Sequence, residues 1–360
     1  MGRRDFLKLF FGSLGLTLFS CGGSAGGSSS NSSQPFSLQK AIKFGLGPDP
    51  ERMIDDYDPA GYMVLNTLTP NIVCMWINGA ALSNGSVYSP SMEYVRNWAQ
   101  EKRFAEWSQK GYELMVITWE NYDGQNSTLG GPTYGNYHIS NQFIQDMTEL
   151  LGYLKAQFSN QLYFALATEQ STYTGCRYNP NICGNQQEEE EQYSDIINST
   201  TEEYFSQLRT NLQKAVSLIE TQIPSAYVGM SFGGWLVNFQ NGIDFIHYFD
   251  SVINESTAVF FQSMIGEKAS ENNGYGNPQQ IMKNCQFYQS YGKPIILSHY
   301  MPSSLRADVV ADDMQTMSAP SYLENLDNYL YAFCFMDYGI LKDNQYNCLT
   351  YTQNFRKELY

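Results

Sequence analysis

The sequence predicts a single α/β domain, a (β/α)8 (TIM) barrel, over residues 38–360. Eight short apolar runs recur along the chain, and most are followed by a segment with helical spacing. The runs are nearly continuous in apolar residues, which is typical of strands buried on both faces of a parallel sheet. Eight strand–helix repeats in a chain of this length favour a closed barrel over an open doubly wound sheet. The sequence contains neither a glycine fingerprint for a dinucleotide nor a P-loop.

The eight runs fix where the strands are expected. They are Ile42–Leu46, Asn71–Ile77, Glu113–Trp119, Leu162–Thr168, Ala226–Phe232, Ala258–Ser263, Pro294–His299 and Tyr331–Met336.

Between these strands, apolar residues at helical spacing predict helices over Glu93–Lys110, Ile139–Phe158 and Glu202–Thr221. Start and stop signals accompany them. Ser140 or Asn141 is expected to cap the second helix, and Thr200 or Thr201 the third, while Gly111 follows the first at a helix-ending position.

The first 20 residues have the order of an export signal. The segment Arg3–Lys8 resembles the core of the bacterial twin-arginine signal, Arg-Arg-x-Phe-Leu-Lys, and the apolar run after it is too short to span a bilayer. Leu18-Phe19-Ser20-Cys21 resembles a lipobox. The resemblance implies cleavage before Cys21, lipidation of its thiol, and a membrane-anchored lipoprotein in the periplasm or on the cell surface. The alternative is an uncleaved N-terminal anchor helix.

Residues 21–37 are mostly Gly, Ser and Asn, a composition that predicts a flexible tether. The whole chain has 21 Lys and Arg against 36 Asp and Glu, a net charge of −15. This charge argues against nucleic acid or an anionic membrane surface as a partner. The membrane contact that we expect is therefore the lipid at Cys21.

Six cysteines remain besides Cys21, and an even number is compatible with disulfides in an oxidising compartment. The pair Cys176 and Cys183, separated by turn-forming residues, is the best candidate. Cys74 and Cys334 lie in strand-like runs and are expected to be core thiols. We expect no metal site and no cofactor, because CxxC spacing is absent and the three histidines are not at ligand spacing.

Four acidic residues follow predicted strands directly, where the side chains of a barrel point into its shared mouth: Asp49, Glu120, Glu169 and Asp337. Glu120 and Glu169 follow neighbouring strands, about 4.8 Å apart. Their carboxylates could approach to about 5–5.5 Å, the separation used by retaining glycosidases. For each acid the competing interpretation is a salt bridge, a helix cap or a loop hydrogen bond. Long connections over 121–138, 170–199 and 266–278 lie on this same face.

Four segments resemble clan-A glycoside hydrolases, particularly the family that contains endo-β-mannanases. They are Pro70–Trp76, Gly111–Trp119, Tyr163–Glu169 and Lys293–His299, similar to that family's second, third, fourth and seventh strands. The resemblance implies that Glu169 is the general acid/base and that the ligand is a glycan. If the barrel binds a glycan, we expect the platform for the sugar at residues at or near strand ends: Trp76, Trp119, Tyr173, Trp235 and Asn78.

Two positions depart from that family. Thr168 replaces the Asn or His that precedes the acid/base, and His299 stands where the strand-7 nucleophile, a Glu, is expected. Three functions therefore stay open. In the first, the protein is a glycosidase in which Glu120 or Asp337 supplies the second carboxylate. His299 then orients a carboxylate or moves a proton, or it is a buried structural histidine. Otherwise the protein is a barrel that binds glycan without cleaving it, or a structural lipoprotein that kept the barrel.

Overall fold

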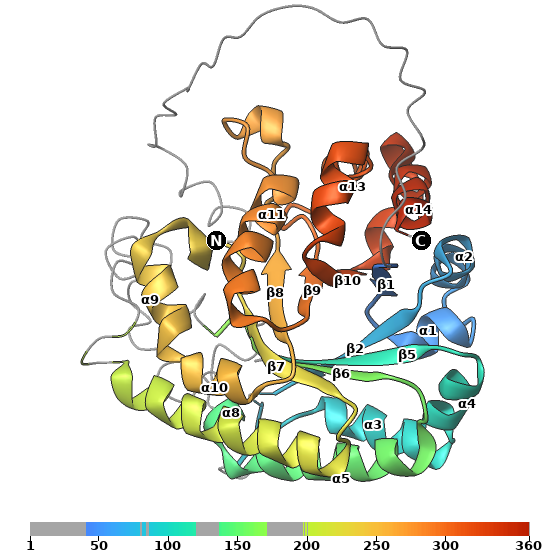
Figure 1. The fold of residues 1–360 in the computed structure, drawn as a ribbon. Helices are drawn as coiled ribbons and strands as arrows, with labels where there is room; N and C mark the ends of the chain where they lie inside the picture. Colours follow the sequence, from blue (N-terminus) through green and yellow to red (C-terminus); the bar gives the residue numbers. More distant parts are fainter. Residues whose placement is uncertain are drawn as a thin grey trace, which may run out of the picture.

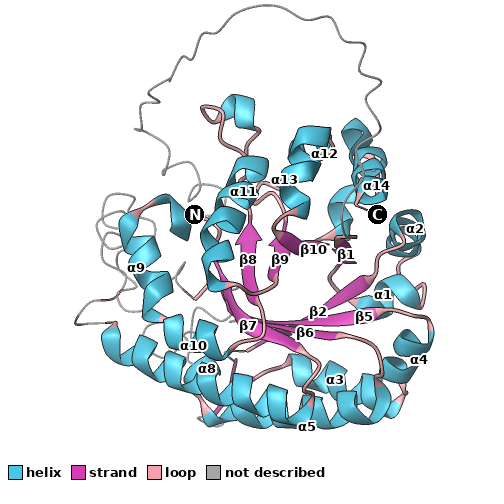
Figure 2. Cartoon of the chain, viewed as in Figure 1, coloured by secondary structure: helices cyan, strands magenta, loops and turns pink. Residues whose placement is uncertain are grey.

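The computed structural model describes residues 41–79, 81–83, 86–119, 137–170, 197, 199 and 201–359. Eight parallel strands close into a barrel in the order β1-β10-β9-β8-β7-β6-β5-β2, and helices surround it (Figures 1 and 2). The predicted (β/α)8 fold is thus confirmed.

Each predicted strand is present, and its bounds differ by at most one residue at either end. The barrel strands are β1 (Lys43–Leu46), β2 (Ile72–Asn78), β5 (Glu113–Trp119), β6 (Leu162–Thr168), β7 (Tyr227–Phe232), β8 (Val259–Ser263), β9 (Ile295–Tyr300) and β10 (Leu330–Phe335). A separate antiparallel hairpin, β3 (Ala81–Ser83) and β4 (Ser86–Tyr88), follows β2.

The helices lie outside the strands, in agreement with the connections expected between parallel neighbours (Figure 2). The α-helices are α1 (Pro50–Ile54), α2 (Pro59–Leu68), α3 (Ser91–Gln100), α4 (Arg103–Gln109), α5 (Asn141–Gln157), α8 (Glu202–Gln222), α9 (Gln240–Tyr248), α10 (Asp250–Glu255), α11 (Asn277–Tyr288), α12 (Ala307–Met317), α13 (Pro320–Asp327) and α14 (Cys348–Glu358). Short 3₁₀ helices are η4 (Tyr137–Ile139), η6 (Leu236–Asn238), η7 (Ala269–Glu271), η8 (Gln289–Tyr291), η9 (Tyr338–Leu341) and η10 (Gln345–Asn347).

The prediction of one helix over 93–110 is wrong, because the chain forms α3 and α4 with a break at Lys102. Lys102 has the left-handed φ of 60°. In a continuous helix, Phe104 would lie roughly opposite Val95, at about 100° per residue. The break turns α4 so that Phe104 and Trp107 pack edge-to-face with Trp98, at centroid distances of 6.2 and 5.3 Å. Core packing therefore overrides local helix continuity here.

The predicted helix ends are confirmed in part. Ser140 Oγ accepts a hydrogen bond from the Phe143 amide at 3.3 Å, which caps α5. Thr201 occupies the N-cap of α8, but its hydroxyl does not cap the helix. Gly111 follows α4 with a φ of 89°, which a residue with a Cβ rarely adopts.

Side chains fill the barrel interior. Alternate strand residues form a buried interior cluster that includes Cys74, Met115, Phe260 and Cys334. At the amino-terminal end of the strands, Glu113 accepts a hydrogen bond of 2.6 Å from the Tyr163 hydroxyl and forms an ion pair with Lys43. The interior is therefore a packed core, and sites of such barrels form at the carboxyl-terminal ends of the strands.

The cysteines in the described ranges are reduced: Cys74, Cys285, Cys334 and Cys348 are free and buried, as expected for Cys74 and Cys334. Cys21, Cys176 and Cys183 lie outside the described residues. None of the helices in the described ranges combines the length and apolar character needed to cross a bilayer.

Candidate functional site

Three rings meet inside the barrel at the carboxyl-terminal ends of its strands. Trp76 on β2 and Trp119 on β5 lie with their centroids 5.1 Å apart. His299 on β9 stacks on Trp76 at 5.9 Å and 19°, and its edge meets Trp119 at 5.2 Å and 72°. Because β9 and β5 lie on opposite sides of the barrel, these rings form a layer that crosses it. His299 is fully buried and Trp119 is nearly so, whereas Trp76 keeps an exposed part.

A β-bulge turns His299 into this layer. Along β9, Ile296 faces the barrel interior and Leu297 faces the helices, so strict alternation would point His299 outward. The register with β8 shifts after Phe261, so that Gln262 pairs with His299. The extra residue on β9 is Ser298, whose hydroxyl bonds to the Ser231 hydroxyl on β7 at 2.9 Å. The bulge therefore places His299 in the mouth.

A second bulge orients Glu169. Between β5 and β6 the pairing passes from Ile117–Ala165 to Trp119–Thr168, which leaves one extra residue on β6. Ala167 and Glu169 both adopt left-handed backbone angles, with φ of 53° and 63°. For residues with a Cβ, such conformations cost about 1–3 kcal/mol each and concentrate at functional sites. Glu169 therefore leaves the strand along a strained path.

The Glu169 carboxylate is buried, with 4% of the residue exposed. The Gln262 side chain, two strands away on β8, donates from Nε2 to Glu169 Oε1 at 3.4 Å. Gln262 pairs in register with His299, so its side chain and the His299 ring enter the barrel side by side. The predicted residues Glu169, His299, Trp76 and Trp119 thus converge on one mouth.

The other two described acids at strand ends, Asp337 and Asp49, have different partners. Asp337 caps η9, since its Oδ1 accepts the Gly339 amide at 2.9 Å. Asp49 precedes α1 with half of its side chain exposed, 3.8 Å from Arg52. Partial burial raises the pKa of Asp49, and the Arg52 charge opposes that shift. Glu120 lies outside the described residues.

The remaining predicted platform residues have mixed outcomes. Asn78 is in register with Trp119 at the end of β2, and its backbone carbonyl accepts a 2.7 Å bond from the Ser89 hydroxyl. Trp235 follows β7 and stacks on Phe239 at 5.3 Å and 16°, so one face of its indole is occupied. Tyr173 lies outside the described residues. In the described part of the chain, no three His, Cys, Asp or Glu side chains gather to hold a metal ion.

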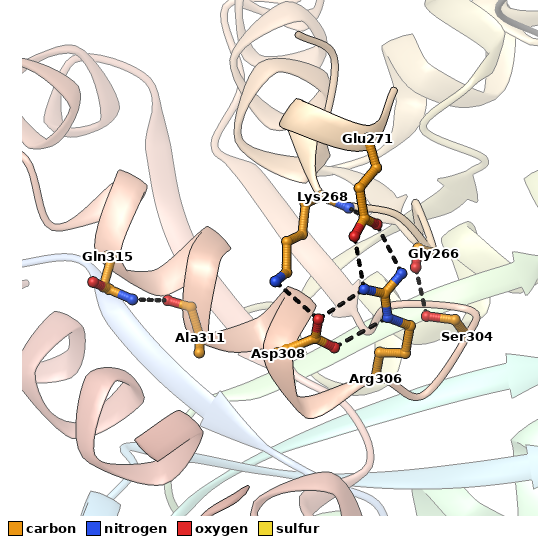
Figure 3. Close-up of polar contacts among 8 residues, drawn as sticks. All are labelled: Gly266, Lys268, Glu271, Ser304, Arg306, Asp308, Ala311 and Gln315. Atoms are coloured by element: carbon orange, nitrogen blue, oxygen red, sulfur yellow. Dashed lines mark hydrogen bonds and ion pairs between the residues drawn. The ribbon is translucent and has the colours of Figure 1, made fainter. Parts of the chain in front are cut away.

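A group of ion pairs among Lys268, Glu271, Arg306 and Asp308, which we call the ionic clasp, joins the segment after β8 to the start of α12, which follows β9 (Figure 3). The Arg306 guanidinium donates two hydrogen bonds to Glu271, at 2.7 and 2.9 Å, and two to Asp308, at 3.0 and 2.7 Å. Lys268 lies 2.9 Å from the same Asp308 carboxylate. The hydrogen bond from Arg306, followed by that from Lys268, holds the pKa of Asp308 well below its usual range. The clasp thus ties together the segments that follow β8 and β9.

Sequence reasoning missed Gln262, His138 and Gln170. A signal for Gln262 was present, because it is a polar residue two positions after the inward-facing Phe260 of an apolar strand. Nothing local marks His138 or Gln170, because their partners come from distant parts of the chain.

Solved structures share this fold. A β-1,4-D-mannanase from Cryptopygus antarcticus matches with a TM-score of 0.52 and 12% identity, over 89% of this chain and 93% of the mannanase. A GH113 β-1,4-mannanase matches with a TM-score of 0.50 and 8% identity, over 89% of this chain and 99% of the other. Neither a family model nor a curated protein matches the sequence. At these identities, the likeness establishes that this chain has the (β/α)8 barrel fold of those hydrolases.

Proposed function

We propose that this protein is a glycoside hydrolase that acts on a polysaccharide or oligosaccharide, with Glu169 as the general acid/base. The observation that carries the proposal is the placement of Glu169. Its carboxylate is buried at the end of β6, on a strained backbone, and accepts a hydrogen bond from Gln262. It lies at the same end of the barrel as Trp76, whose ring keeps an exposed part and suits the apolar face of a sugar. The mannanase fold of the solved structures supports the same reaction class.

In the proposed reaction, Glu169 protonates the glycosidic oxygen as the bond from that oxygen to the anomeric carbon breaks. A water molecule adds to the anomeric carbon and gives its proton to a second carboxylate, which must lie about 6.5–9.5 Å from Glu169 to leave room for that water, farther than in a retaining pair. Glu120, directly after the neighbouring strand β5, is our choice for that base. Asp337 is a weaker choice because its carboxylate already caps η9. We assign His299 to the floor of the sugar site, where it supports both tryptophans.

A second function, binding of glycan without cleavage, is favoured by one observation. The strand-7 position that resembles the nucleophile holds His299, fully buried between two tryptophan rings. Such a residue cannot form the ester-like intermediate of a retaining glycosidase. In this alternative, the mouth is a sugar-stacking platform.

The test is the release of reducing ends from β-mannans, β-glucans, xylans and α-glucans by residues 38–360. We expect release from at least one polymer, and a loss of about 10²–10⁴-fold in Glu169→Gln. Glu324→Gln, an exposed acid on α13, is the matched control and should retain wild-type turnover. Unchanged turnover in Glu169→Gln would exclude Glu169 as the acid. Binding to a polymer in affinity electrophoresis, without release, would select the binding function.

We also propose that the protein is exported and anchored by lipid at Cys21, as a periplasmic or cell-surface lipoprotein. This proposal is supported by the order of the signal, lipobox-like segment and Gly/Ser tether along residues 1–37.

A further inference from the structure

His138 lies on η4, outside the barrel wall, and is fully buried. Its Nε2 is 2.9 Å from Thr118 Oγ1, and its Nδ1 is 3.2 Å from Gln170 Nε2. The Tyr204 hydroxyl donates to Gln170 Oε1 at 2.6 Å, which leaves the Gln170 amide nitrogen to donate to the imidazole. One arrangement satisfies all these contacts. His138 is neutral, Nε2–H donates to Thr118, and Nδ1 accepts from Gln170.

These bonds hold the backbone on both sides of Glu169. Thr118 Oγ1 also accepts the Ala167 amide at 3.0 Å, so it fixes the left-handed residue two positions before Glu169. Gln170, which binds His138 directly, is the residue immediately after Glu169. His138 therefore bonds to Gln170 directly and is linked to Ala167 through Thr118.

The histidine is itself anchored from a separate element. Asn211 on α8 donates from Nδ2 to the His138 carbonyl at 2.9 Å, and the Phe143 ring meets the imidazole at 4.9 Å. The support thus runs from the helix layer through His138 to the end of β6, and it does not depend on the clasp at β8 and β9.

We infer that His138 is a positioning residue for Glu169, which holds the strained end of β6 so that the carboxylate points at the glycosidic oxygen. This inference rests on the proposed function. Misplacement of a catalytic group by about 1 Å costs roughly 10²-fold in rate. Loss of His138 should therefore slow those reactions in which Glu169 must donate a proton to the leaving group.

The test compares two substrates of whichever sugar the wild type cleaves: an unactivated oligosaccharide and the corresponding dinitrophenyl glycoside. The dinitrophenolate departs without protonation, so its release does not need the acid. We expect His138→Leu to lose about 10²-fold in kcat on the oligosaccharide, with KM and dinitrophenol release nearly unchanged. His138→Gln, whose amide can still donate to Thr118, should recover much of the loss.

Thr118→Val and Thr118→Ser give a second pair that tests the same bonds if His138→Leu does not fold. Thr118→Val should lose rate on the oligosaccharide but not on the dinitrophenyl glycoside. Thr118→Ser, which keeps the hydroxyl, should lose rate on neither. Thr352→Val removes another buried hydroxyl, which bonds within α14 on the far side of the barrel, and should change neither rate. Equal losses on both substrates would overturn the positioning role. A wild type that cleaves neither substrate would refute the proposed function itself.

Discussion

The buried Asp313 should make the protein lose stability as the pH rises, and Asp313→Asn should remove that dependence. Asp313 on α12 is 1% exposed. Its Oδ2 accepts from Asn277 Nδ2 and from the Tyr300 hydroxyl, both at 2.8 Å. Among the described residues, no donor reaches Oδ1. Burial outweighs the two hydrogen bonds and raises the pKa of Asp313 to about 7 from its usual 3.8.

The sign follows from the raised pKa of the folded state. Below pH 3.8 both states hold a neutral acid, and the folded state is not penalised. Above that pH the unfolded state ionises freely, whereas the folded state gives up its proton only near pH 7. At about 1.4 kcal/mol per pKa unit, the free energy of unfolding falls by about 4 kcal/mol from below pH 3.8 to well above pH 7. Between pH 5 and pH 8 the expected fall is about 2.5 kcal/mol.

The assay is urea unfolding of wild type and Asp313→Asn at pH 5 and pH 8. Asparagine cannot ionise, and its side-chain oxygen can still accept from Asn277 and Tyr300. From pH 5 to pH 8, the free energy of unfolding of the wild type should therefore fall by about 2.5 kcal/mol more than that of the variant, whatever the stability of the variant at pH 5. Comparison of the two proteins cancels the titrating groups that they share, and comparison of the two pH values cancels any effect of the substitution that does not depend on pH. Parallel pH dependence of the two proteins would refute this reasoning.

Two further predictions concern the surface and the N-terminus. Arg306→Gln should remove the fork of the ionic clasp (Figure 3) and lower the free energy of unfolding by about 1 kcal/mol or less, since the side chain is 38% exposed. Unfolding in low and high salt checks it, because the loss should shrink as salt screens the pairs; a loss that is equal in both would mean that packing, not charge, was removed. Cys21→Ser should abolish lipidation, so that detergent partition of expressing cells finds the wild type in the detergent phase and the variant in the aqueous phase. Aqueous partition of the wild type would contradict the anchor.

Much of the fold was predictable because each barrel strand is buried on both faces. That burial demands a nearly continuous apolar run, which can be read without knowledge of partners. The predicted strands 113–119 and 162–168 coincide with β5 and β6. The helix prediction failed at Lys102 because the direction of α4 is set by the packing of Phe104 and Trp107 against Trp98, which local spacing does not encode.

The same division holds for the site. The sequence alone determined that Glu169 and His299 lie at strand ends, because strand ends follow from the apolar runs. Only the tertiary structure decided which way they face. His299 enters the barrel because of the bulge at Ser298, and Glu169 is turned by a left-handed backbone held through Thr118. A bulge reverses inside and outside for every later residue of a strand, and its position depends on register with neighbours far away in the chain.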